Sequence, residues 1–136
     1  MRTDRLRVLV ADDEPLLRRA VVRLLQGTFE IVGQVATGRE LVSTAVELRP
    51  DVIVSDFAMP GMSGIAAMEM LRAAGFTPLF VLMTATTHDV NEWLARGVQA
   101  IVDKADLSLD LVAAVHSVAA GRVFLSRTVR SGPSPT

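Results

Sequence analysis

The chain has 136 residues, of which 50% are hydrophobic and 21% charged, and this is enough for one globular domain with a buried core. Its 14 basic and 15 acidic side chains give a formal net charge of -1, so the chain as a whole has no electrostatic preference for nucleic acid or for an anionic membrane. The lack of cysteine excludes disulfides, a thiolate nucleophile and a cysteine metal site.

Five short runs rich in β-branched residues predict strands, at residues 6–11, 31–36, 52–55, 79–83 and 100–102. The first, third and fourth runs are almost continuously apolar and do not alternate with polar residues. This pattern is typical of parallel strands that are covered on both faces of a sheet.

Segments with helical spacing of apolar residues follow the strands in turn, at residues 15–26, 39–48, 64–74, 89–96 and 106–120. In the first of them, Pro15 suits the opening turn and Gly27 suits the end. The order βαβαβαβαβα requires right-handed crossovers, so we expect an α/β fold with a five-stranded, doubly wound parallel sheet. The last residues, 131–136, are expected to form a linker or tail.

The N-terminal apolar run is short and leads into two aspartates, which is not the pattern of a signal peptide. No apolar stretch approaches the roughly 18 residues that a membrane-spanning helix needs. These features predict a soluble cytoplasmic protein that has no contact with a membrane.

Polar residues stand at the ends of four of the five predicted strands. In open parallel sheets, ligands bind beyond the carboxyl ends of the strands, so these side chains should meet at one edge. They are Asp12 and Asp13 after the first strand, Asp56 after the third, Thr84 after the fourth, and Asp103 with Lys104 after the fifth. Lys104 is the only lysine in the chain.

Each of these residues also has an ordinary interpretation. Asp13 or Glu14 would suit the cap of the helix that starts near Pro15, and a lysine is usually a solvated surface charge. Together these interpretations weaken, because three carboxylates at one place repel one another, and without a cation at least one should have a raised pKa. Ligands that are all oxygen atoms favour Mg²⁺. A carboxylate beside Mg²⁺ can attack phosphorus, while an ammonium and a hydroxyl bind phosphoryl oxygens.

At this point the sequence resembles the response-regulator receiver family over residues 6 to about 120. The motifs that carry the resemblance are VLVADDEP at 8–15, DVIVSDFAMPGMSG at 51–64, VLMTA at 81–85 and the lysine after the fifth strand. The resemblance implies a flavodoxin-like fold with strand order 2-1-3-4-5. It places the receiver domain at residues 1–122.

The resemblance also implies the role of each site residue. Asp56 would accept a phosphoryl group from a sensor histidine kinase, with Mg²⁺ as the cofactor. The ion would be held by Asp13 and Asp56 directly, by Asp12 through water and by the backbone carbonyl of Ala58. The Thr84 hydroxyl and the Lys104 ammonium would bind the phosphoryl group, and Pro60 and Gly64 match the turn after the acceptor strand.

Residues 106–126 are similar to the NarL/FixJ type, in which the last helix leads toward a DNA-binding helix-turn-helix. This implies a transcription regulator in which residues 123–136 form a linker toward a helix-turn-helix that is absent from these residues. DNA would be bound only through that domain, and a homodimer is possible. A receiver that works alone is the alternative.

Two residues depart from the family pattern or have an open role. Ile101 stands three residues before the lysine, where most members carry Tyr or Phe, so the aromatic half of the usual output switch is in doubt. Trp93, on the fourth helix, is expected either to fill the core or to be exposed on the signalling face. His88 and His116 are interpreted as surface or boundary residues and not as ligands.

Three functions remain to be compared. The first is a phospho-accepting switch that catalyses only its own phosphorylation and hydrolysis and is not an enzyme on an external substrate. The second is a phosphatase of the haloacid-dehalogenase type, which resembles a DxDxT pattern, whereas Phe-Ala-Met-Pro follows Asp56 here. The third is a pseudo-receiver that works by protein contacts without phosphorylation. Uptake of a phosphoryl group in the presence of Mg²⁺ separates them.

Overall fold

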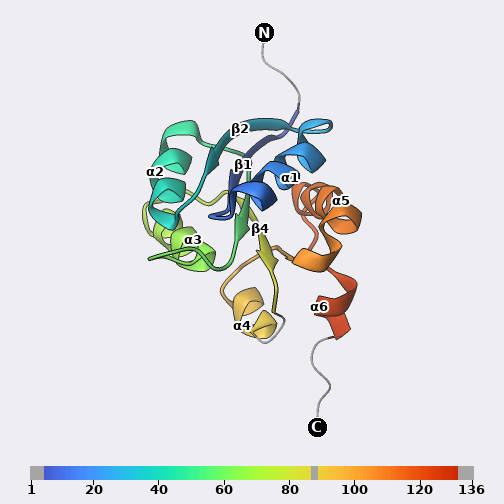
Figure 1. Cartoon of the computed structure of the whole chain (residues 1–136). Helices are drawn as coiled ribbons and strands as arrows, with labels where there is room; N and C mark the ends of the chain where they lie inside the picture. The colour runs from blue at the N-terminus through green and yellow to red at the C-terminus, as the bar shows by residue number, and fades with distance from the viewer. Residues whose placement is uncertain (1–4, 87–88, 132–136) are drawn as a thin grey trace.

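The computed structural model describes residues 5–86 and 89–131, which form one parallel sheet covered by helices on both faces (Figure 1). His88 and residues 132–136 of the expected linker lie outside the described residues. The strands are β1 (Arg7–Ala11), β2 (Glu30–Val35), β3 (Val52–Asp56), β4 (Leu79–Thr84), β5 (Ala100–Asp103) and β6 (Phe124–Leu125). Their order in the sheet is β2-β1-β3-β4-β5-β6, and every neighbouring pair is parallel.

The helices alternate with the strands, and the first five lie where the apolar spacing predicts them, whereas the sixth was not predicted. They are α1 (Pro15–Gln26), α2 (Gly38–Leu48), α3 (Gly64–Ala73), α4 (Val90–Ala95), α5 (Leu107–Ala119) and α6 (Arg127–Ser131), with a single 3₁₀ turn, η1 (Lys104–Asp106), before α5. The doubly wound α/β fold is therefore confirmed, and the order of the first five strands is the expected one.

The expected number of five strands is wrong, because β6 adds a sixth. It pairs with β5 through Ala100 with Phe124 and Ile101 with Leu125. Two residues are too few to show a strand pattern in a sequence, so the segment was indistinguishable from a linker. The division of the chain at residue 122 stays a prediction, but β6 is part of the sheet, and α6 lies against β5 with Val129 only 3% exposed.

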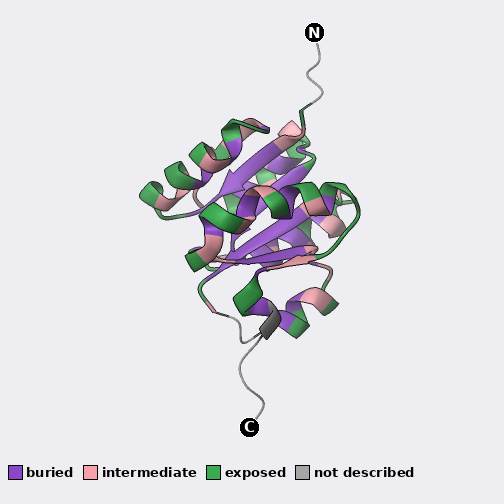
Figure 2. Ribbon diagram, turned by 90° about the vertical axis from the view of Figure 1, so that its right-hand side faces the viewer, coloured by how far each residue is buried: buried purple, intermediate pink, exposed green. Residues whose placement is uncertain are grey.

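The two faces of the sheet have separate apolar cores, because side chains alternate along each strand. Val52 and Val54 of β3 face the core beneath α1 and α5, and Ile53 faces the core beneath α2, α3 and α4. Figure 2 shows the strands buried between exposed helix surfaces. This two-sided burial explains the continuous apolar runs in the sequence, and it leaves the strand ends as the place for polar chemistry.

Trp93 is a core residue, since it is 2% exposed and packs with the apolar side chains beneath α4. The end of α4 is held to α3 by side-chain hydrogen bonds. Arg72 of α3 donates to the carbonyls of Arg96 and Gly97, each at 2.7 Å, and Arg96 forms an ion pair with Glu69. Thus the C-terminal end of this six-residue helix has a defined attachment.

His116 is exposed on α5, with its ring 5.0 Å from that of Phe29, in agreement with a surface or boundary position. Within residues 5–86 and 89–131, none of the helices is both long and apolar enough to cross a membrane.

Candidate functional site

Three carboxylates meet at the carboxyl ends of β1 and β3, two neighbouring strands inside the sheet. Asp12 and Asp13 follow β1 and Asp56 ends β3, and one oxygen of each lies within 4.8 Å of the others. Asp12 is fully buried, Asp56 is 3% exposed, and Asp13 is exposed. The convergence that the strand pattern predicts is therefore present in the fold.

The fold leaves Asp13 available for a ligand. Glu14, and not Asp13, caps α1, since its carboxylate accepts from the backbone amides of Leu16 at 3.3 Å and Leu17 at 2.6 Å. This arrangement removes the ordinary interpretation of Asp13 as a helix cap. Its carboxylate lies in the cluster instead.

Asp12 is fixed in position by three neighbours. Its backbone amide donates to Val35, its Oδ1 accepts from the Glu14 amide at 2.9 Å, and its carbonyl accepts from the Arg18 guanidinium at 2.8 Å. Its other carboxylate oxygen, Oδ2, is buried and has no hydrogen-bond partner among the described residues. Burial first of all, and the charges of Asp56 and Asp13 in addition, raise the pKa of Asp12 above its ordinary 3.8.

These properties suit the binding of a cation. An unpartnered buried carboxylate oxygen is costly, and a cation bound among three carboxylates would compensate it. The ligands are all oxygen atoms, which is the ligand set that Mg²⁺ prefers. Asp12, Asp13 and Asp56 therefore fit the ion that the sequence implied. The part predicted for the carbonyl of Ala58 stays a prediction.

We expect the stability of the metal-free protein to depend on Asp12 protonation. Because its folded pKa is above its unfolded pKa, the folded state binds the proton more tightly, so this contribution is complete below about pH 3.8 and is lost as the pH rises through the folded pKa. The Asp12→Asn variant carries no such group. Urea unfolding in EDTA across this pH range should therefore show the free energy of unfolding of the wild type falling relative to the variant as the pH rises. A wild-type free energy of unfolding that rises relative to that of the variant as the pH rises would contradict the prediction.

The only lysine of the chain, Lys104, reaches the cluster from the end of β5. Lys104 opens η1 directly after β5, and its Nζ lies 2.8 Å from Oδ1 of Asp56. The side chain of Lys104 is 26% exposed and that of Asp56 is 5% exposed, so the pair is partly screened from water. The amide of Ala58 lies 3.4 Å from the same Oδ1. One oxygen of Asp56 thus faces cationic and N–H groups, as a phosphoryl-binding site requires.

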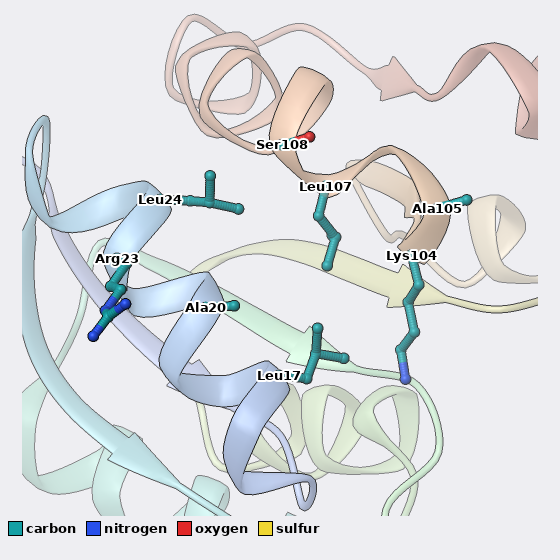
Figure 3. Close-up of a pocket in the computed structure, with 8 residues that line it drawn as sticks. All are labelled: Leu17, Ala20, Arg23, Leu24, Lys104, Ala105, Leu107 and Ser108. Atoms are coloured by element: carbon teal, nitrogen blue, oxygen red, sulfur yellow. The ribbon is translucent and has the colours of Figure 1, made fainter.

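Lys104 also stands at one end of a groove between α1 and the start of α5 (Figure 3). The groove has a volume of about 480 Å³ and is lined mainly by apolar side chains, with Leu17 and Ala20 on one wall and Leu107 on the other. In Figure 3 the ammonium end of Lys104 points away from η1 toward the level of Leu17. Lys104 therefore both lines the groove and contacts Asp56.

The backbone after Asp56 is held by very close packing. Ser55 Oγ donates to the carbonyl of Asp56 at 2.9 Å, and the amide of Gly64 donates to the carbonyl of Phe57 at 2.9 Å. A Cβ on Gly64 would lie 2.5 Å from the Asp56 carbonyl oxygen and 2.7 Å from Ser55 Oγ. Gly64 was expected from the resemblance, whereas Ser55 was missed, because a lone serine inside an apolar strand gives no sequence signal.

Thr84 lies at the expected edge, but its hydroxyl is turned to its own loop. Thr84 ends β4 and is 1% exposed. Its Oγ1 donates to the Thr86 carbonyl at 2.8 Å and accepts from the Thr86 amide at 3.1 Å.

Two strands away from Asp56, Ile101 is fully buried and paired with Leu82. An aliphatic core side chain thus occupies the position where the resemblance implies an aromatic ring.

Trp93 contacts the residue that follows Asp56, through a ring contact that the sequence did not reveal. Phe57, the residue after Asp56, stacks on Trp93 with ring centroids 4.6 Å apart and planes tilted by 36°. Trp93 is the only tryptophan in the chain. The ring pair links the end of β3 to α4.

We expect Trp93 fluorescence to report on Asp56. Mg²⁺ and a small phosphodonor should change the intensity or the emission maximum of the wild type, because a change at Asp56 moves the backbone of Phe57 and hence the stacked rings. The Asp56→Asn variant should show no such change. An identical response in both proteins would show that Trp93 senses the donor or the salt and not Asp56.

A doubly wound parallel sheet with an acidic cluster and a lysine at its strand ends defines the receiver class of signalling domain. The response regulator receiver domain family matches residues 8–116, and the chain belongs to this family. Within it, the chain is similar to the nitrate/nitrite response regulator protein homolog of Haemophilus influenzae, at 33% identity over 94% of this chain, and to NarL of Escherichia coli K12, at 33% over 90%.

A solved structure is similar over nearly the whole described fold. The signal receiver domain of the putative response regulator NarL from Mycobacterium tuberculosis has a TM-score of 0.82 and 30% identity, covering 88% of this chain and all of that one. The chain spans 64% of the length of the Haemophilus protein and 58% of Escherichia coli NarL. Other relatives are protein-glutamate methylesterases, of which the chain matches 26% to 38% of the length.

Proposed function

We propose that this receiver is a phosphoryl-accepting switch of a two-component system, in which Asp56 takes a phosphoryl group from a sensor histidine kinase in a Mg²⁺-dependent reaction. The observation that carries the proposal is the 2.8 Å contact between Lys104 Nζ and Asp56 Oδ1 beside the cluster of three carboxylates. A carboxylate placed between a cation site and an ammonium is suited to become an acyl phosphate.

In the proposed reaction a carboxylate oxygen of Asp56 forms a bond to phosphorus. The bond from phosphorus to the imidazole nitrogen of the kinase breaks, and the imidazole leaves with the electron pair. Mg²⁺, when bound to the carboxylates, offsets negative charge on the phosphoryl oxygens. Hydrolysis later returns the Asp56 carboxylate and inorganic phosphate, so the chain turns over no external substrate.

Two side chains change partners in this scheme. The Lys104 ammonium, which now contacts Asp56 Oδ1, binds a phosphoryl oxygen in the product. The Thr84 hydroxyl has to release the Thr86 carbonyl before it can do the same. This exchange of hydrogen bonds would bias α4, β5 and α5 between two arrangements. With Ile101 in place of an aromatic, the stacked Phe57 and Trp93 are the ring pair available to carry the change toward α4.

The wider role follows from the NarL-type resemblance. We propose a cytoplasmic transcription regulator in which DNA is contacted through a separate helix-turn-helix domain beyond this receiver. A homodimer and a histidine kinase are the proposed protein partners.

The phosphatase alternative is disfavoured by the residue two positions after Asp56. Phosphatases of that type place an acid there, whereas Ala58 has no ionisable group. The pseudo-receiver alternative is disfavoured by the intact cluster and the lysine contact.

The test is to weigh the intact protein after incubation with Mg²⁺ and acetyl phosphate. We expect one added phosphoryl group in the wild type, and none in Asp56→Asn or in the presence of EDTA. Uptake of a phosphoryl group by Asp56→Asn would refute the assignment of Asp56 as the acceptor. A protein that takes up nothing with Mg²⁺ present would be a pseudo-receiver, and steady turnover of a phosphomonoester would identify a phosphatase.

A further inference from the structure

The segment after α5 folds back onto the carboxyl end of β5, beyond residues 8–116 to which the family was matched. Ser126 is fully buried and binds residues of two elements, β5 and α5. Its amide donates to the Ile101 carbonyl at 3.0 Å, its Oγ accepts from the Asp103 amide at 3.0 Å, and its hydroxyl donates to Asp110 of α5 at 2.8 Å. The end of β5 is therefore fixed by a residue located 23 positions later in the chain.

Thr128, at the start of α6, holds the side chain of Asp103, the last residue of β5. Its hydroxyl lies 2.7 Å from Oδ2 of Asp103 and 3.4 Å from Oδ2 of Asp106. The other oxygen of Asp103 accepts from the Ala105 amide at 2.8 Å. Both carboxylate oxygens of Asp103 are thus engaged, one by the turn that contains Lys104 and the other by α6.

These contacts exceed what is needed to cover the edge of a sheet. Backbone pairing of β6 with β5 and burial of Val129 would do that without polar side chains. Instead, the hydroxyls of Ser126 and Thr128 both bind Asp103, the residue before Lys104. The direction of the Lys104 side chain depends on the backbone of this turn, and its Nζ must stay within reach of Asp56.

We propose that Ser126 and Thr128 are positioning residues for Lys104, so that the β6–α6 segment is energetically coupled to the phosphorylation of Asp56. The inference rests on the proposed function and extends it to residues beyond the matched region 8–116. Coupling is reciprocal: if the segment helps to place Lys104, then phosphorylation of Asp56 changes how firmly the segment is held. The chain would in this way transmit the signal directly to its own C-terminal end.

The first arm of the test compares variants that differ only in the hydroxyl. Thr128→Val keeps the shape of the side chain and loses the hydroxyl donor, whereas Thr128→Ser keeps the hydroxyl donor. We expect Thr128→Val to lower the maximal rate of phosphorylation about three- to tenfold with little change in the dependence on acetyl phosphate concentration. Thr128→Ser should restore the rate, and Ser126→Ala should lower it further. Thr28→Val is the matched control, because Thr28 is an exposed threonine that binds Arg5 through its carbonyl.

A double-mutant cycle separates positioning from a general loss of stability. In a Lys104→Met background, Thr128→Val should produce no further loss of rate, since its effect acts through Lys104. Equal losses in both backgrounds, or a wild-type rate for Thr128→Val, would overturn the inference. Wild-type protein that accepts no phosphoryl group would instead refute the proposed function, so the two failures are distinguishable.

The second arm measures the reciprocal effect by hydrogen exchange of the amides in residues 124–131. Addition of Mg²⁺ and acetyl phosphate should change their exchange at least about twofold in the wild type and leave it unchanged in Asp56→Asn. Unchanged exchange in a wild type shown by mass to be phosphorylated would overturn the coupling.

Discussion

Replacement of Lys104 with methionine is expected to slow phosphoryl uptake by Asp56 about a hundred- to a thousandfold, the usual loss when a group that stabilises transition-state charge is removed. Methionine has a similar length and no charge, so the 2.8 Å contact with Asp56 Oδ1 is lost while packing is largely kept. The rate of mass increase with acetyl phosphate measures the effect.

The same substitution should lower stability when no metal is present. It leaves Asp56 beside Asp12 and Asp13 without its cation, which we expect to cost about 1–3 kcal/mol in urea unfolding with EDTA. Lys104→Arg should give an intermediate rate, because it keeps the charge but spreads it over a planar group. Arg19→Met, at an exposed position on α1, is the control and should behave like the wild type. Phosphorylation of Lys104→Met at the wild-type rate would exclude the proposed part for Lys104.

Substitution of Gly64 by alanine is expected to damage both the fold and the site. The new Cβ would lie 2.5 Å from the Asp56 carbonyl oxygen, a backbone atom that cannot move without displacing Asp56. We expect a loss of about 1–3 kcal/mol in the free energy of unfolding, the usual range for overpacking. Phosphorylation should slow as well, because Asp56 shifts relative to Lys104.

Gly27→Ala is the matched control for Gly64→Ala. Gly27 has φ of -71°, and an added Cβ there would meet no atom of the described structure within 4 Å. Alanine at this position should be neutral or stabilise the fold by up to about 1 kcal/mol, through the reduced freedom of the unfolded chain. If Gly64→Ala resembled Gly27→Ala in unfolding and in phosphorylation rate, the close packing at Asp56 would be shown to be unimportant.

The main elements of the fold were predictable because strands that are buried on both faces of the sheet consist of runs of apolar residues, which can be seen in the sequence. β3 and β4 are clear examples, since residues 52–54 and 80–83 are all apolar and fully buried. The segment that forms β6 and α6 carries no such signal. Its polar residues, Ser126 and Thr128, acquire partners only when the chain returns to β5.

The site was predictable at the level of residue types and strand ends, and unpredictable at the level of hydrogen bonds. Asp12, Asp13, Asp56 and Lys104 converge because parallel strands end at one edge. The choice of Glu14 as the cap of α1, and the turn of the Thr84 hydroxyl toward Thr86, depend on local backbone angles that residue spacing does not specify.

The attachment of α4 to α3 gives the helix a pivot. Arg72 holds the carbonyls of Arg96 and Gly97, while at the opposite end Asp89 gives the helix no side-chain cap among the described residues. Six residues at 1.5 Å each make a lever about 9 Å long, so a rotation of about 20° about the held end would carry Val90 by about 3 Å. Any movement of α4 would thus be smallest near Gly97 and largest at the end that follows Thr84 in the chain.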